Sequence, residues 1–290
     1  MTAHRLWALD GAHLTMDRTE LVDGAEPGPV TFPAPSFLVE HDGGLVLFDT
    51  GVTPVAAPDP GKAFGEAGPQ ITYDVSQRVD RQLEQLGVAT SDVTHVVLSH
   101  AHFDHTGGLG LFAQARFLVG RGELPTAFWP GPGLGGAYRH ADLDPTRRFD
   151  WTYLDAELDL FDDGGLVVLP MPGHTPGNLA LLVRLPQRTI LLTGDTAHLR
   201  EALERLAPME ADADQEAAVR SLEAINRIAA ENDAEVWVGH DPDDWQRFGA
   251  PGLIGRPRIG PGLPAPDAAR RPAGDHSSRS ESRSEPNPDR

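Results

Sequence analysis

The sequence contains no cysteine, few basic side chains and no long apolar run. Without cysteine, no thiolate can bind a metal ion, and no disulfide indicates a cellular compartment. The 24 Lys and Arg residues stand against 43 Asp and Glu, so the formal net charge is −19 and would repel nucleic acid. Residues 1–11 lack the basic start and apolar run of a signal peptide, and no stretch approaches the length of a membrane span. We therefore expect a cytoplasmic protein with no nucleic-acid or membrane partner.

The sequence does contain a dense group of candidate metal ligands, the run H-A-H-F-D-H at residues 100–105. It follows the apolar, β-branched segment 93–98, which predicts a buried strand, and it precedes a T-G-G turn. Imidazole nitrogen and carboxylate oxygen are ligands that zinc accepts, and the helical H-E-x-x-H signature is absent. Four potential ligands within six residues favour two metal ions held side by side over a group of surface polar residues near a turn.

Three more polar residues follow apolar runs later in the chain. His174 lies in the turn P-M-P-G-H-T-P-G between two apolar runs, Asp195 ends the run T-I-L-L-T-G-D, and His240 follows V-W-V-G. Taken singly, each would more often be an ordinary turn residue than a ligand. Because each follows a predicted strand, as the H-A-H-F-D-H run does, their joint presence favours one shared metal site.

The set H-x-H-x-D-H, G-H-T-P-G, L-T-G-D and G-H-D resembles the metallo-β-lactamase superfamily, and within it most closely the N-acyl homoserine lactonase family. The likeness extends from about Ala34 to about Phe248. It implies an α/β fold, a four-layer αβ/βα sandwich with a dinuclear metal site at the sheet edges. We expect this hydrolase domain to span residues 1–254. Residues 255–290 are rich in Arg, Pro and Ser and poor in large apolar side chains, which predicts a disordered tail.

The resemblance implies a ligand role for seven residues. They are His100, His102 and His174 for the first ion, Asp104, His105 and His240 for the second, and Asp195 as the bridge between the ions. The cofactors would be two divalent metal ions, with zinc as the default, although such sites also accept iron, cobalt or manganese. A metal-bridging hydroxide would attack the ester carbonyl and open the ring of an N-acyl homoserine lactone. Asp104 would carry a proton to the leaving alkoxide.

One position departs from the family pattern. Three residues after the bridging aspartate, the family commonly has a tyrosine that hydrogen-bonds the substrate carbonyl, whereas this chain has His198. His198 could donate that hydrogen bond or bind substrate, and it could equally be a solvent-facing residue at the start of a helix over 199–206. We count His198 with Asp104 as a catalytic candidate, and the exact substrate depends on it.

Two long segments, 52–73 and 124–151, are rich in Pro and Gly and predict loops that act as lids over the site. Their aromatic rings could line an acyl-chain pocket, although most such rings hold a loop against its own domain. Phe64 and Trp129 are the candidates for substrate contact.

The remaining pattern predicts regular elements. Residues 36–40 and 45–49 predict a hairpin, with Asp49 at its end as a structural residue and not a ligand. Helical spacing predicts one helix between residues 75 and 86, with a buried face formed by Val75, Val79, Leu83 and Leu86. A second, longer helix is predicted over 214–231.

Several other functions fit parts of this pattern. A glyoxalase II-like thioesterase shares the ligands but normally adds a helical C-terminal domain, and a flavo-diiron oxygen reductase carries Glu in place of His102. A non-catalytic scaffold that has kept the fold and lost the chemistry would be expected to lack ligands, whereas all seven positions are filled. The negative charge argues against the nuclease branch, and the absence of cysteine separates the chain from β-lactamases with a cysteine ligand. The expected partner is a small-molecule lactone or ester, with a homodimer as one option.

Overall fold

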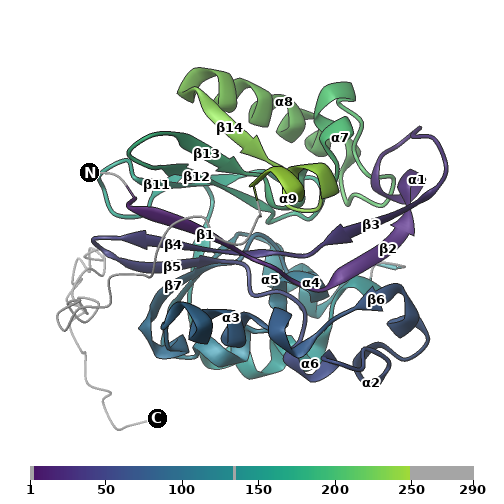
Figure 1. The fold of residues 1–290 in the computed structure, drawn as a ribbon. Coiled ribbons are helices and arrows are strands. Elements are labelled where there is room, and N and C mark those ends of the chain that lie inside the picture. The colour runs from purple at the N-terminus through teal and green to yellow at the C-terminus, as the bar shows by residue number, and fades with distance from the viewer. Residues whose placement is uncertain (1–2, 133–134, 249–290) are drawn as a thin grey trace, which may run out of the picture.

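Two large β-sheets face each other in the computed structural model, which describes residues 3–132 and 135–248 (Figure 1). The first sheet has the strand order β1 (Arg5–Leu9), β4 (Ser36–His41), β5 (Gly44–Phe48), β7 (Val93–Val97), β8 (Arg116–Gly120) and β9 (Asp150–Leu154). The second has the order β10 (Leu158–Asp159), β11 (Leu166–Pro170), β12 (Leu179–Arg184), β13 (Thr189–Leu192) and β14 (Ala234–Trp237). A small third sheet has the order β3 (Pro29–Pro33), β2 (His13–Asp17) and β6 (Ile71–Thr72).

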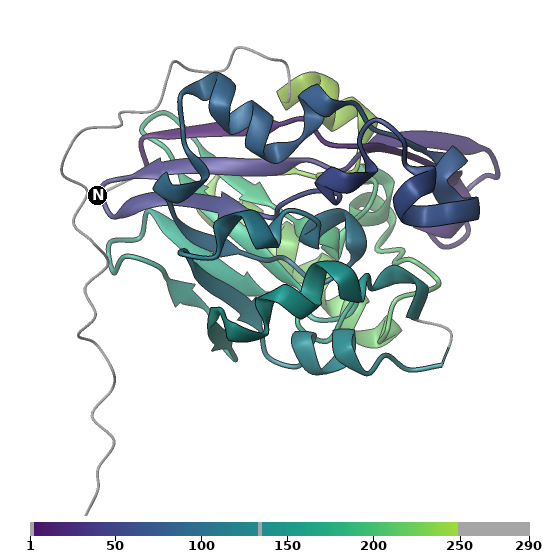
Figure 2. The same cartoon turned by 90° about the horizontal axis from the view of Figure 1, so that it is seen from below.

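Helices cover the outer faces of both large sheets, so the layers run helix, sheet, sheet, helix (Figure 1). The upper layer contains α7 (Arg200–Arg205) and α8 (Gln215–Asn232). The lower layer contains α3 (Val79–Leu86), α5 (Glu123–Phe128) and α6 (His140–Leu143), and Figure 2 shows its blue and teal helices in front of the strands. The other helices are α1 (Arg18–Leu21), α2 (Gly61–Phe64), α4 (Phe103–Thr106) and α9 (Pro242–Phe248). This is the predicted αβ/βα sandwich.

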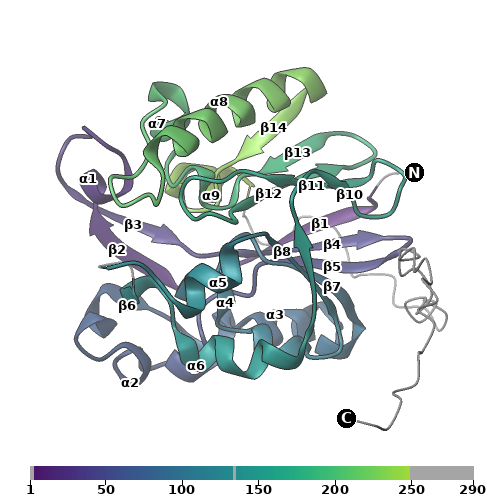
Figure 3. The ribbon, with the colours of Figure 1, turned by 180° about the vertical axis from the view of Figure 1, so that it is seen from behind.

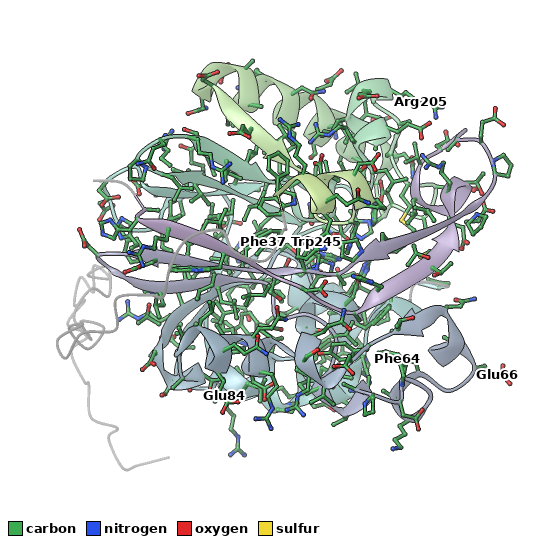
Figure 4. The ribbon with its side chains drawn as sticks, viewed as in Figure 1. Phe37, Phe64, Glu66, Glu84, Arg205 and Trp245 are labelled. Carbon is green, nitrogen blue, oxygen red and sulfur yellow. The ribbon has the colours of Figure 1, made fainter. Side chains whose placement is uncertain are left out.

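The apolar core follows from the two-residue period of the strands. On β12, Leu179, Leu181 and Val183 face the other large sheet, whereas Ala180 and Leu182 face the helical layer. All five side chains are buried, because both faces of the sheet are covered. Phe37 and Trp237 meet between the sheets with ring centroids 4.9 Å apart, and Figure 4 shows Phe37 near the middle of the molecule.

Strand direction brings several chain segments to one end of the sandwich. Strands β5, β7, β8 and β9 run parallel, and so do β13 and β14. Strand β11 has the same direction as β13, because both are antiparallel to β12. The segments that leave β11, β13 and β14 therefore emerge at a common edge, and those that leave β5 and β7 emerge at a common edge of the first sheet. The predicted ligands lie in these segments.

The structure confirms most of the predicted elements. Strands β4 and β5 form the expected antiparallel hairpin, with Phe37 opposite Phe48 and His41 opposite Gly44. Helix α8 begins after Asp214, whose carboxylate accepts a hydrogen bond from the backbone N–H of Ala217.

The helix predicted over residues 75–86 is wrong in its first part. Residues 75–77 form a separate 3₁₀ turn capped by Asp74, and α3 begins only at Val79. Arg78 has extended backbone angles and separates the two pieces. Val79 and Leu83 are buried as expected, but the side chain of Val75 is 39% exposed because it lies outside the amphipathic face.

The two segments predicted as loops contain short helices. The first includes α2 and the turns Pro54–Ala56 and Gly65–Gln70, and the second includes α5, α6 and the turn Asp144–Arg148. Figure 3 shows the small third sheet and α1 projecting to one side of the two large sheets. None of the helices in the described part of the chain has the length and hydropathy needed to span a bilayer. The predicted domain boundary at 254 and the predicted tail at 255–290 lie outside the described residues.

Candidate metal centre

The seven predicted ligands come together at the end of the sandwich where four strands terminate. The segment after β7 and the short helix α4 supply four of them, and the segments after β11, β13 and β14 supply one each. The resulting groups are His100, His102 and His174, and separately Asp104, His105 and His240. Within each group, one potential ligand atom per residue lies within 4.8 Å of the others.

Asp195 lies between the two groups. Its Oδ2 atom is 3.6 Å from Nε2 of His100 and 3.6 Å from Nε2 of His174. Its Oδ1 atom is 3.3 Å from Nε2 of His105 and 3.1 Å from Nε2 of His240. One oxygen therefore faces each group, which is the arrangement that a bridging carboxylate requires.

The residues of the cluster fit divalent metal ions. Nε2 of His100 and Nε2 of His105 are buried and have no hydrogen-bond partner within the described chain. A buried polar atom without a hydrogen-bond partner destabilises the folded protein, so these two nitrogens indicate that a ligand binds there. Nitrogen and oxygen donors that converge in this way suit zinc and related divalent ions.

The protonation of His100, His102 and Asp195 suits a cation, whereas the carboxylates that face His105, His174 and His240 raise the pKa of these three rings despite their burial. Burial holds the pKa of His100 and of His102 well below the ordinary value, so both rings are neutral at pH 7 and keep a free lone pair. Burial alone would raise the pKa of Asp195, but the surrounding histidines, His240 first, hold it well below the ordinary value. The bridge is therefore a carboxylate.

Hydrogen bonds from Nδ1 to an aspartate or to a backbone oxygen orient three of the histidines. His105 donates from Nδ1 to Oδ2 of Asp49 at 2.9 Å, and His174 donates from Nδ1 to Oδ1 of Asp212 at 2.7 Å. His240 donates from Nδ1 to the backbone oxygen of Pro33 at 2.6 Å. With Nδ1 engaged, Nε2 of each ring faces the cluster, a pattern typical of metal-binding histidines.

Of the two carboxylates, Asp49 was predicted from the sequence as a structural residue and Asp212 was not predicted. Asp49 was expected to be structural, and it also accepts a hydrogen bond from the backbone N–H of Ser99 at 2.7 Å. Sequence reasoning missed Asp212, which lies 38 residues from His174 in an acidic run before α8. The one available signal was an aspartate close to a helix start, and that is common without any functional role.

His198 is buried in the cluster, so the solvent-facing alternative is wrong. Its side chain is 8% exposed, and its Nε2 lies 3.2 Å from Oδ2 of Asp195. The neighbours Ala197 and Leu199 have extended backbone angles and pack into the apolar core. Because side chains alternate along an extended segment, His198 points the opposite way, between the rings of His174 and His240.

A pocket of about 650 Å³ opens onto the cluster. Its base contains His198 and five of the candidate ligands, which are His102, Asp104, His174, Asp195 and His240. Its apolar wall comes largely from the N-terminal part of the chain and includes Leu14, Met16, Leu21, Phe32, Ile71, Phe103, Tyr138 and Met209. The ring of Tyr138 contacts that of His102 edge-on, with centroids 4.9 Å apart.

Neither of the two predicted substrate contacts lies on this wall. Phe64 packs behind Phe103 with ring centroids 5.0 Å apart, and Figure 4 shows it in the lower half of the molecule. Trp129 is 77% exposed and lies beside Phe128. The two segments predicted to line the pocket do contribute Ala67, Gln70, Ile71, Ala137 and Tyr138, and strand β2 and helix α1 supply further lining residues that the sequence did not indicate.

Comparison with known proteins agrees with this geometry. The family model of the metallo-β-lactamase superfamily matches residues 29–240, so the chain belongs to this superfamily. The N-acyl homoserine lactonase AttM of Rhizobium radiobacter is 38% identical over 225 residues, which cover 74% of this chain and 84% of the relative. The N-acyl homoserine lactonase of Bacillus cereus is 27% identical over 248 residues, which cover 83% and 94%. The chain therefore belongs to the N-acyl homoserine lactonase family of this superfamily.

A solved structure supports the same assignment. It is an N-acyl homoserine lactone hydrolase with the product N-hexanoyl-L-homoserine bound at its catalytic metal centre. Its TM-score is 0.77 at 25% sequence identity, and the match covers 88% of this chain and 100% of that chain. The fold and family expected from the sequence motifs are thus confirmed.

Proposed function

We propose that the protein is a dinuclear metal-dependent lactonase that opens the ring of N-acyl homoserine lactones. The observation that carries this proposal is the position of Asp195 between two ligand groups at the base of a largely apolar pocket. The relatives with matching sequences are named N-acyl homoserine lactonases, and the solved neighbour holds the ring-opened product of such a lactone.

The residues of the two groups would hold one ion each, with Asp195 as the bridge. When bound, two divalent ions lower the pKa of a water molecule and polarise an ester carbonyl. In the hydrolysis, water adds to the carbonyl carbon, the ring C–O bond breaks, and the leaving oxygen takes up a proton. Asp104 belongs to the second group and borders the pocket, with Oδ2 3.6 Å from Nε2 of His240, so it is placed to accept a proton from the added water and pass it to the leaving oxygen.

His198 and the apolar wall would act on the substrate. Burial lowers the pKa of His198, so its ring is neutral at pH 7 and carries one N–H that can donate to the lactone carbonyl. The wall can hold an acyl chain by apolar contact. The proposal also includes zinc as the native ion, a cytoplasmic location, a homodimer and a catalytic domain over residues 1–254.

A substrate comparison tests this function. Metal-reconstituted protein is assayed in a pH-stat with N-acyl homoserine lactones and, separately, with lactoylglutathione, beside a measurement of bound metal. We expect two bound ions and turnover of the lactones. Thioester turnover without lactone turnover would identify a thioesterase instead, and failure to bind any metal would leave a scaffold protein.

Exchange of His198 tests its role at the carbonyl. His198→Tyr restores the residue common in the family, so we expect lactone turnover to be preserved or raised. His198→Phe keeps an aromatic ring but has no hydrogen-bond donor, and we expect kcat to fall about a hundredfold. Steady-state kinetics on preparations of equal metal content provide the measurement. Wild-type kcat in His198→Phe would show that this side chain does not contact the reacting carbonyl.

A further inference from the structure

Glu123 is a buried carboxylate outside the predicted ligand set. It is the first residue of α5, just after β8, and its side chain has no solvent exposure. Burial of a carboxylate is costly unless strong hydrogen-bond donors surround it, and burial raises the pKa of Glu123. Such a residue needs a structural or functional reason to be where it is.

The two oxygens of Glu123 bind two different ligand-bearing segments. Oε1 accepts a hydrogen bond from the backbone N–H of Ala101 at 2.8 Å, and Ala101 lies between His100 and His102. Oε2 accepts one from the backbone N–H of Gly177 at 3.0 Å, in the turn that contains His174. One carboxylate therefore links the backbones of both segments that supply the three-histidine group.

Glycine makes this contact possible. A Cβ atom on Gly177 would lie 2.6 Å from Cβ of Glu123, and a Cβ atom on Gly120 would lie 2.0 Å from the backbone oxygen of Gly177. Gly122 has φ +92°, which favours glycine and turns the chain from β8 into α5. The end of β8 thus approaches the His174 turn more closely than residues with side chains would allow.

The spacing of the histidines depends on these two segments. Nδ1 of His102 and Nε2 of His174 lie 3.0 Å apart, although the residues are 72 positions apart in the chain. A metal site tolerates little error in ligand position, and groups that orient ligands are worth about ten- to a hundredfold in metal affinity. Glu123 hydrogen-bonds the backbones of the two segments that carry these rings.

We propose that Glu123 is a positioning residue that holds the His100–His102 segment and the His174 turn at the spacing needed by the first metal ion. This inference rests on the proposed dinuclear centre. Glu123 does not touch the ligand atoms; it acts through the backbones of the residues that carry them. Its effect is therefore selective: it concerns the three-histidine ion and not the ion of Asp104, His105 and His240.

The test is a Co²⁺ titration of the metal-free full-length protein, followed by visible absorption, with Glu123→Gln beside the wild type. Glutamine keeps the shape but has one acceptor oxygen, so one of the two backbone N–H groups would face an amide NH₂. Two reference variants, His102→Ala and His240→Ala, identify the absorption band of each ion. The matched control is Glu40→Gln. It changes a buried carboxylate beside Arg5, at the end of β4 that lies away from the metal centre.

We expect wild type and Glu40→Gln to bind two ions, and Glu123→Gln to bind the three-histidine ion about tenfold more weakly with the other unchanged. The weakened band should be the one lost in His102→Ala. If Glu123→Gln does not fold, Glu123→Asp keeps the charge but is one methylene shorter, and should show the same selective weakening. Equal affinity in wild type and variant, or equal weakening of both ions, would overturn the inference alone. A wild type that binds no Co²⁺ would overturn the proposed function and this inference with it.

Discussion

Replacement of Asp195 with asparagine is expected to lower kcat/KM for lactone hydrolysis by about a thousandfold. The two oxygens of Asp195 face the two ligand groups, with Oδ2 3.6 Å from Nε2 of His100 and Oδ1 3.1 Å from Nε2 of His240. An amide removes the negative charge that both ions would share and turns one of the two positions into a donor. Loss of about 4 kcal/mol of transition-state stabilisation corresponds to this factor. Steady-state kinetics and the metal content of the purified variant provide the measurements.

The matched control is Asp163→Asn. Asp163 also faces a histidine, with Oδ2 3.1 Å from Nε2 of His41, but at the opposite end of β4 from the metal centre. We expect Asp163→Asn to keep the metal content and kinetics of the wild type. If Asp195→Asn retained both ions and more than a tenth of the activity, Asp195 could not be the bridge between them.

Removal of both bound ions by a chelator is expected to lower the free energy of unfolding by about 8 kcal/mol, that is about 4 kcal/mol for each ion present at a thousand times its dissociation constant. Without a cation, the Nε2 atoms of His100 and His105 remain buried with no hydrogen-bond partner in the described chain. Each such atom is costly in the folded state and is hydrated in the unfolded state. Denaturant unfolding of metal-loaded and chelated protein, followed by far-ultraviolet circular dichroism, measures the difference.

The control is the same experiment on Asp195→Asn. Because this variant should bind the ions weakly, we expect chelation to change its stability much less than that of the wild type. Identical unfolding curves for loaded and chelated wild type would contradict the view that the buried histidines serve as ligands.

The candidate ligands could be picked out from the sequence because each of them follows a predicted strand closely. His174, Asp195 and His240 lie in short turns after β11, β13 and β14, and strand direction brings these turns to one edge. A buried strand has a clear apolar signature, so its end can be found from local pattern alone. The same holds for the long helix α8, which has a strong cap and a regular apolar face.

Local pattern was less informative where the chain changes direction. The apolar spacing of residues 75–86 suggests one helix, but the extended backbone at Arg78 divides it into a 3₁₀ turn and α3. The orientation of His198 was also open from the sequence, since an extended segment and the start of a helix place its side chain differently. Packing of Ala197 and Leu199 into the core decided it.

The sequence by itself determined the superfamily, the seven candidate ligands and the strands that deliver them, because these depend on motifs of a few residues each. Only the tertiary structure decided which carboxylates orient the ligands, where the pocket wall lies and which way His198 faces. Asp212 meets His174 across 38 residues, and Glu123 meets Ala101 and Gly177 across 22 and 54. Such contacts arise when separate elements pack together, and a buried hydrogen bond between distant residues leaves no periodic signal in the sequence.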